Sequence, residues 1–267
     1  MRIISVLENF AAEKELSSEH GLSLFIETCG AEKILFDTGQ SGVFVENAVK
    51  LGVDLTQIDF LVISHGHYDH GGGLKRFFEI NSGAEVYIRQ GAFKSRYSQK
   101  PAGMKFIGLD PDLENNTRFV KCDDFQKISG EIFLFSGVNG VFPRPVGNSL
   151  LFDKDRETLD NFSDEQNLVI TENKKTFLFA GCAHCGIVNI MEKMYSLFGK
   201  YPDYVFSGFH LMKSGQDEVE FLAEKLLTYK NTMYYTMHCT GLEQFEVMKK
   251  IMGGRIDYFS CGSVFSV

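Results

Sequence analysis

The chain has 267 residues, 44% of them apolar, which is enough core material for one large α/β domain or two small ones, and we expect one. A formal net charge of −8 argues against a broad basic surface for nucleic acid. The N-terminal segment is too short and too soon acidic for a signal peptide, and no apolar run approaches membrane-spanning length, which together predict a cytoplasmic protein.

The first sixty residues are predicted to open a β-sheet. Strands are expected over 2–8, 22–27 and 33–36. The turn 29–32 favours a hairpin between the last two strands. A helix is predicted over 43–51, and Asp37, between the third strand and this helix, has the pattern of a helix cap or turn residue.

Four groups of metal-ligand type follow the apolar run 60–63 within six residues. They are His65, His67, Asp69 and His70. Imidazole and carboxylate are ligands that Zn²⁺ takes, and two histidines on a tight turn can reach one ion while the next Asp-His pair turns toward a second. Glycines at 66 and 71–73 are expected to let the backbone take this sharp path. The pattern therefore predicts a metal site rather than a polar turn with incidental histidines.

Beyond this motif, a helix is predicted over 74–80 and a strand over 84–89. Residues 91–165 are the least regular part, with four of the five prolines and short strand-like runs at 118–121 and 131–137. We expect this region to hold a substrate-shaping insertion or a homodimer contact within the single domain 1–267. Arg144 is either a contact for an anionic substrate or part of a solvated loop.

The second half repeats one local theme. Three predicted strands, 176–180, 204–206 and 233–237, each lead through a histidine-bearing turn to a predicted helix, and the helices are expected at 187–197, 219–227 and 242–252. The turns carry His184, His210 and His238. Counting the central motif, the theme occurs four times. Because ligands gather at the carboxyl ends of strands in open α/β sheets, these turns are predicted to converge.

The pattern His65-x-His67-x-Asp69-His70 after a strand resembles the signature of the metallo-β-lactamase superfamily. The segments 181–187, 207–211 and 237–241 are similar to one branch of it, the metal-dependent hydrolases related to the methanopterin-pathway dihydropterin-ribofuranosylaminobenzene phosphate synthase. The resemblance implies an αββα sandwich, with two mixed β-sheets face to face and helices outside. It also implies that Asp37 orients a metal-bound histidine or its loop, and that His20 is a pocket residue rather than a surface histidine.

Within this family framework, we assign His65, His67 and His184 to one ion, and Asp69, His70 and His238 to another. Three protein ligands per ion is the open arrangement typical of catalysis. Cys182 stands where the superfamily usually has a bridging Asp, so it is either a thiolate ligand or a thiol beside the site. No histidine lies between His70 and His184, so His184 fills the remaining place. Two divalent ions are predicted, with zinc favoured and manganese or iron as alternatives.

The predicted reaction is attack of a metal-bound hydroxide on an ester, amide, lactone or phosphodiester bond of a small molecule. Asp69 would orient the hydroxide and accept its proton. His210 would bond substrate or shuttle protons, unless it is simply a partly buried histidine. Cys182-x-x-Cys185 at a strand-to-helix junction also has the form of a thioredoxin-like redox pair.

Three other functions fit the same fold. One is a transferase like the dihydropterin-ribofuranosylaminobenzene phosphate synthase. Another is an iron-dependent oxidoreductase, although iron-type relatives often carry Glu where His67 stands. The third is a binding protein that has lost activity, against which the complete ligand set argues. Metal analysis, a substrate panel and pterin binding would separate them.

Overall fold

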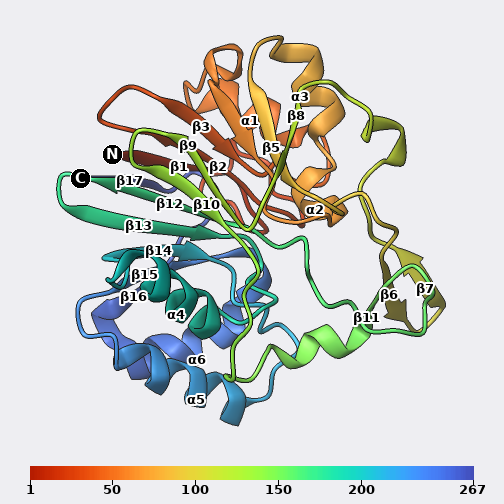
Figure 1. Cartoon of the computed structure of the whole chain (residues 1–267). Coiled ribbons are helices and arrows are strands. Elements are labelled where there is room, and N and C mark those ends of the chain that lie inside the picture. The colour runs from red at the N-terminus through yellow and green to blue at the C-terminus, as the bar shows by residue number, and fades with distance from the viewer.

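The computed structural model describes residues 1–267 and contains two seven-stranded mixed β-sheets packed face to face, with helices on both outer faces (Figure 1). The strand orders are β17-β1-β2-β3-β4-β5-β8 and β16-β15-β14-β13-β12-β10-β9. This αββα sandwich confirms the fold class predicted from the sequence. None of its helices is long and apolar enough to span a membrane.

The first sheet is built mainly from the N-terminal half. Its strands are β1 (Arg2–Leu7), β2 (Ser23–Glu27), β3 (Lys33–Phe36), β4 (Phe60–Val62), β5 (Glu85–Arg89), β8 (Phe119–Cys122) and β17 (Val264–Ser266). β2 and β3 form the predicted antiparallel hairpin, whereas β3, β4, β5 and β8 run parallel. Its outer face is covered by α1 (Val43–Lys50) and α3 (Leu74–Ile80), which bury Phe44 and Phe77 against it.

The second sheet is built from the C-terminal half. Its strands are β9 (Phe125–Ser129), β10 (Ile132–Phe135), β12 (Asn167–Glu172), β13 (Lys175–Ala180), β14 (Tyr204–Ser207), β15 (Met233–Thr236) and β16 (Ile256–Tyr258). β13 to β16 are parallel. The outer face is covered by α4 (Ile187–Phe198), α5 (Gln216–Leu227) and α6 (Leu242–Met252).

Alternating side chains divide each strand between two cores. In β3, Ile34 and Phe36 point into the layer between the sheets, whereas Leu35 packs under the helices. The layer between the sheets is rich in aromatic rings: Phe36 meets Phe179 of the other sheet at a centroid distance of 6.2 Å, and Phe179 stacks on Phe206 at 5.3 Å. This packing fixes the two sheets, and therefore the ends of their strands, relative to one another.

Several elements were not predicted. The most consequential is a third sheet of β11 (Leu151–Phe152), β6 (Tyr97–Lys100) and β7 (Gly103–Phe106), which stands apart from the sandwich (Figure 1). Its strands are only four, four and two residues long, which is too short for a hydrophobic periodicity to be detected. The others are β9, β12, β16, β17 and the single turn α2 (Tyr68–Gly71). β8 and β10, also within 91–165, belong to the main sheets.

Candidate metal centre

Five strands, each through the turn that follows it, deliver predicted site residues to one edge of the sandwich. β4 is followed by His65 and His67, β13 by His184, β14 by His210 and β15 by His238, while Asp37 directly follows β3. Parallel strands end on the same side of a sheet, so these turns converge. Centroid distances between imidazole rings from different turns are 4.9 Å for His65 and His184 and 5.0 Å for His70 and His238.

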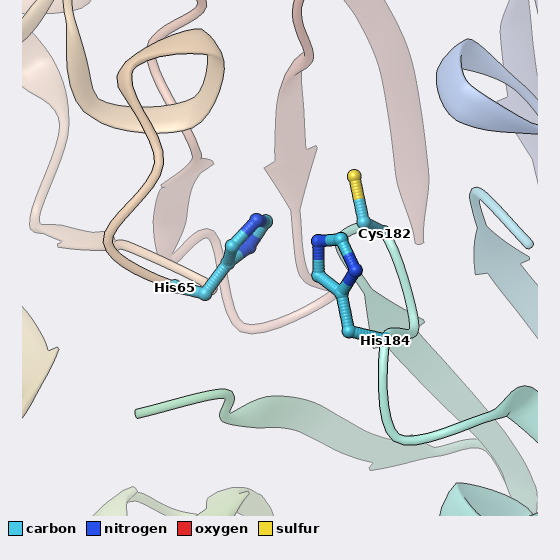
Figure 2. A group of neighbouring side chains, drawn as sticks. All are labelled: His65, Cys182 and His184. Carbon is cyan, nitrogen blue, oxygen red and sulfur yellow. The ribbon is translucent and has the colours of Figure 1, made fainter. Parts of the chain in front are cut away.

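The first group of ligand-type atoms lies around His65. Its Nε2 is 3.1 Å from Nδ1 of His67. The ligand atoms of His65, Cys182 and His184 all lie within 4.8 Å of one another, and the three side chains are buried. Figure 2 shows the His65 ring, from the turn after β4, facing the His184 ring from the turn after β13. These atoms are close enough to bind one ion together.

The second group lies around His70. Its Nε2 is 3.1 Å from Sγ of Cys182, and the ligand atoms of His70, Cys182 and His238 form another cluster within 4.8 Å. Nε2 of His238 lies 3.4 Å from Oδ2 of Asp69. Cys182 belongs to both groups and therefore lies between them. Its Sγ is therefore within 4.8 Å of ligand atoms of both groups.

The second ring nitrogen of three of these histidines is held by an oxygen acceptor. Nδ1 contacts Asp37 Oδ2 in His70 (2.6 Å), Asn148 Oδ1 in His184 (2.9 Å) and Asn9 Oδ1 in His238 (2.8 Å). A proton on Nδ1 leaves Nε2 as a lone-pair donor, which is how proteins orient metal-binding imidazoles. Nε2 of His184 and of His238 is buried without a hydrogen bond. Such orphaned bases are costly unless a cation binds them, so the residues fit a metal site.

Electrostatics agree with neutral ligands in the first group. Burial lowers the pKa of His65 and of His184 well below the ordinary value, which keeps both rings unprotonated. His70 differs: burial opposes its charge, but the adjacent Asp37 carboxylate raises the pKa to about 9. An ion bound at His70 must therefore displace a proton at neutral pH.

Buried carboxylates hold the turns that carry the ligands. Asp37 accepts hydrogen bonds from the Ser64 amide and hydroxyl, both at 2.7 Å. Asp164 accepts from the Gly66 amide at 2.7 Å. Glu165 accepts from the amides of His184 (2.6 Å) and Cys185 (2.9 Å). The equivalent acceptor for the His238 amide is Glu8. Each of these turns is therefore fixed by charge-assisted hydrogen bonds.

Apart from Asp37, these carboxylates were not predicted. In the sequence, Glu8 ends a strand, and Asp164 and Glu165 lie in a polar stretch typical of a surface loop. Nothing local shows that all three are buried in the fold. The one available signal is that Asp164 and Glu165 lie a few residues before the apolar run that begins at Leu168, as Asp37 stands directly after one.

The turns also contain unusual backbone conformations. Asp37, Ala183, His210 and His238 have positive φ angles of 62°, 54°, 52° and 51°. Such left-handed conformations are uncommon for residues other than glycine and persist only where the surroundings impose them.

The glycines of the central motif act differently, because Gly66 does not have a positive φ. A Cβ on it would lie 1.9 Å from the Ala92 carbonyl oxygen, so close backbone approach explains it.

A cavity of about 250 Å³ opens over the ligand groups. Both predicted pocket histidines line it. Nε2 of His20, with a half-exposed side chain, lies 3.1 Å from Oδ2 of Asp69. The His210 ring lies 4.3 Å from the His184 ring, and its Nδ1 has no hydrogen-bond partner. Arg144 does not line the cavity: its guanidinium donates to the Asn161 carbonyl instead.

Two further questions concern the cysteines near the cavity: the role of Cys239, and whether Cys182 and Cys185 form a redox pair. Cys239 was not predicted as a site residue, but its Sγ lies within 4.8 Å of ligand atoms of Cys182 and His210 and lines the cavity. Cys182 and Cys185 are both free thiols. Burial, followed by the charge of Glu165, raises the pKa of the Cys185 thiol, which is the opposite of what a thioredoxin-like pair requires. This electrostatic environment argues against the redox interpretation.

Comparison with known proteins agrees with this arrangement. The family model described as "Metallo-beta-lactamase superfamily" matches residues 19–157. A solved structure described as Tm1679, a metal-dependent hydrolase of the beta-lactamase superfamily, is 32% identical with a TM-score of 0.85, covering 100% of this chain and 99% of that one. Zinc-bound PqqB from Methylobacterium extorquens, 11% identical with a TM-score of 0.61 and 100% coverage of both chains, shares the fold.

A curated relative from Methanocaldococcus jannaschii is named 7,8-dihydropterin-6-methyl-4-(beta-D-ribofuranosyl)-aminobenzene-5'-phosphate synthase. It is 28% identical over 284 residues, covering 97% of each chain. An αββα sandwich with histidine, carboxylate and thiol groups gathered at one edge defines a metal-binding fold whose relatives are enzymes. The chain belongs to the metallo-beta-lactamase superfamily. Membership implies divalent metal ions at this edge.

Proposed function

We propose that this protein is a hydrolase that depends on two divalent metal ions. The observation that carries the proposal is that Nε2 of His184 and Nε2 of His238 are both buried without a hydrogen bond. His184 lines the cavity together with Asp69 and Cys182, and Nε2 of His238 lies 3.4 Å from Oδ2 of that Asp69. His65, His67 and His184 would hold one ion, and Asp69, His70 and His238 the other, with Cys182 between them. The relative described as a metal-dependent hydrolase supports this assignment.

Zinc fits this donor set best, because imidazole and thiolate are ligands it favours over calcium or magnesium. Ions held there supply Lewis acidity and make hydroxide available at neutral pH. The chain's own residues supply orientation and proton transfer. Asp69 lies against His20 and His238, so one carboxylate oxygen can accept a proton from an attacking water while His20 relays it toward solvent.

We assign His210 a contact with the substrate. Its ring borders the cavity, and its unpaired Nδ1 offers a hydrogen bond. The rest of the cavity wall is partly apolar, with Tyr68, Ile107, Leu151 and Met212 among the lining residues. Such a wall excludes water from part of the substrate, and a few polar groups fix its orientation.

The test is hydrolysis by the metal-loaded protein. The purified chain, with its metal content measured, is assayed on carboxylic ester, lactone, amide and phosphodiester substrates with added Zn²⁺ or Mn²⁺. We expect turnover of at least one class, with a loss of about a thousandfold in His67→Ala. Lys14→Gln, at an exposed position away from the cavity, is the control. Absence of turnover with fully loaded metal would refute the hydrolase, and visible absorbance from bound iron would favour an oxidoreductase.

The second candidate is a synthase acting on a pterin. Its support is the curated relative, which matches this chain from end to end, and the Tyr68 ring and Met212 in the cavity wall, which suit a flat ring. Quenching of the fluorescence of a reduced pterin titrated with wild-type protein would favour this function. Absence of quenching at millimolar pterin would exclude it.

A further inference from the structure

The hairpin of β6 and β7 is attached directly to the metal motif. The Tyr68 amide donates to the Ile107 carbonyl oxygen at 2.9 Å, and His67 and Gly108 form an isolated antiparallel bridge. These contacts tie the chain that leaves β7 to the two residues that directly precede Asp69. The small sheet seen apart from the sandwich in Figure 1 is therefore held beside the cavity.

The register of this hairpin places two lysines on the cavity side. Ser98 pairs with Lys105, and Lys100 lies two residues after Ser98 on the same face. Ser98, Lys100 and Lys105 all line the cavity. Lys100 and Lys105 are diagonal neighbours, which in an antiparallel pair lie within reach of a common ligand.

The opposite face of the hairpin carries the apolar side chains. Phe106 packs edge-on against Tyr97 with centroids 5.7 Å apart and remains 43% exposed, and Met104 is 36% exposed. An ordinary half-buried hairpin turns its apolar face inward and its charges to solvent. Here the lysines line the cavity and remain solvent-exposed, while the apolar side chains lie on the other face, so the apolar face does not set which side meets the cavity and the charges there require their own explanation.

A third lysine reaches the cavity from the other side. Lys213 lies in the loop after β14, three residues beyond His210, and also lines the cavity. None of the three lysines forms an ion pair with a carboxylate, and Asp69 is the single carboxylate in the cavity wall. Nζ of Lys105 instead lies 5.1 Å from the centre of the Tyr68 ring.

This concentration of positive charge contrasts with the chain's net charge of −8. Like charges around one small cavity repel unless an anion is bound among them. Lysine is a common binder of phosphate, which it meets as a point charge. A phosphate carries nearly two negative charges at neutral pH, whereas a carboxylate carries one, so three lysines match a phosphate better.

We propose that Lys100, Lys105 and Lys213 bind a phosphate group of the substrate, distinct from the bond that is broken over the ligand groups. Resting on the proposed hydrolase function, this assigns the substrate class: a small phosphorylated molecule whose phosphate meets the lysines while its reacting bond faces Asp69. The alternative is that inward-pointing lysines only protect the edges of a small sheet from aggregation, and it predicts no anion affinity.

The experiment is calorimetric titration with phenylphosphonate, which has no ester bond to hydrolyse, and with benzoate, a monoanion on the same ring. The variant is Lys100→Gln/Lys105→Gln, which removes two charges and keeps most of each side chain. The control is Lys14→Gln/Lys250→Gln, which changes net charge equally at exposed positions away from the cavity. All proteins are titrated both metal-loaded and metal-free, because a phosphonate can also bind metal directly.

We expect phenylphosphonate to bind wild type more tightly than benzoate does. We expect its Kd to rise at least about tenfold in the cavity variant, in both metal states, and less than about twofold in the control. Lys213→Gln alone should raise it about threefold to tenfold. Equal Kd values for cavity variant and control would overturn the proposal, as would equal binding of benzoate.

Failure of this proposal and failure of the hydrolase remain distinguishable because binding is measured without turnover. If phosphonate binding depends on the lysines but the protein hydrolyses no substrate, the anion-site proposal stands and the hydrolase proposal is refuted. If the protein hydrolyses a substrate but phosphonate binding does not depend on the lysines, the hydrolase proposal stands and the anion-site proposal is refuted.

Discussion

Asp37→Asn is the substitution that most sharply tests how the metal ligands are oriented. Oδ1 of Asp37 accepts from the Ser64 amide, while Oδ2 accepts from the Ser64 hydroxyl and contacts His70 Nδ1 at 2.6 Å. In the variant, the carboxamide oxygen of Asn can still accept the hydrogen bond from the Ser64 amide. Its NH₂ then occupies the place of Oδ2 and donates to His70 Nδ1. The His70 proton is forced onto Nε2, the atom that faces Cys182 Sγ.

An imidazole with its proton on Nε2 cannot bind an ion through that atom. Loss of such an orienting partner costs roughly 10 to 100-fold in metal affinity, or about 1.4 to 2.8 kcal/mol. Because two charge-assisted contacts are lost at a fully buried carboxylate, we also expect the metal-free protein to lose about 1.5 to 3 kcal/mol of unfolding free energy. The ion of His65, His67 and His184 should be retained.

Chelator competition with metal analysis measures the two affinities separately, and urea unfolding of the metal-free protein measures stability. Asp123→Asn removes an exposed carboxylate and is the matched control. If Asp37→Asn bound both ions as tightly as wild type, the inference that Asp37 sets the His70 tautomer would be wrong.

Three further predictions test how the turns and the core are built. Gly66→Ala should abolish metal binding or prevent folding, because its Cβ would lie 1.9 Å from the Ala92 carbonyl oxygen, whereas Gly83→Ala, with no atom within 4 Å, should be nearly neutral in thermal unfolding and metal content. Glu165→Ala leaves the buried amides of His184 and Cys185 unpaired and should lower the unfolding free energy by about 2 to 5 kcal/mol in urea, against no measurable change for the exposed Glu157→Ala; equal effects would show that Glu165 does not hold the turn. Burial raises the pKa of Cys122 from 9.0 to about 12, so the thiol ionises first in the unfolded chain and the free energy of unfolding should fall as pH rises above 9. Cys122→Ser should weaken this pH dependence of the unfolding free energy. An unchanged pH dependence in the variant would contradict the prediction.

The central motif could be predicted because its chemistry is local. His65, His67, Asp69 and His70 lie within six residues, so their metal-binding character is visible without the fold. The convergence of His184 and His238 on that motif followed from a repeated strand, turn and helix pattern. It needed only the rule that parallel strands end together. Helix boundaries were equally accessible where periodicity was strong, as in α3 and α6.

The supporting residues could not be predicted because their contacts join distant parts of the chain. Asn148 meets His184 across 36 residues, and Asn9 meets His238 across 229. An asparagine in a loop has the same local sequence whether it orients a ligand or faces solvent. The lysines of the β6–β7 hairpin were hidden for another reason: the register that turns them toward the cavity contradicts the usual pattern of apolar residues inside.

Metal stoichiometry of the wild type beside His184→Ala and His238→Ala tests the central claim most directly, with elemental analysis after loading and dialysis. Our account predicts two ions per wild-type chain and the loss of one in each variant, a different one in each case. Retention of both ions in either variant, or the absence of any bound ion in the folded wild type, would contradict it.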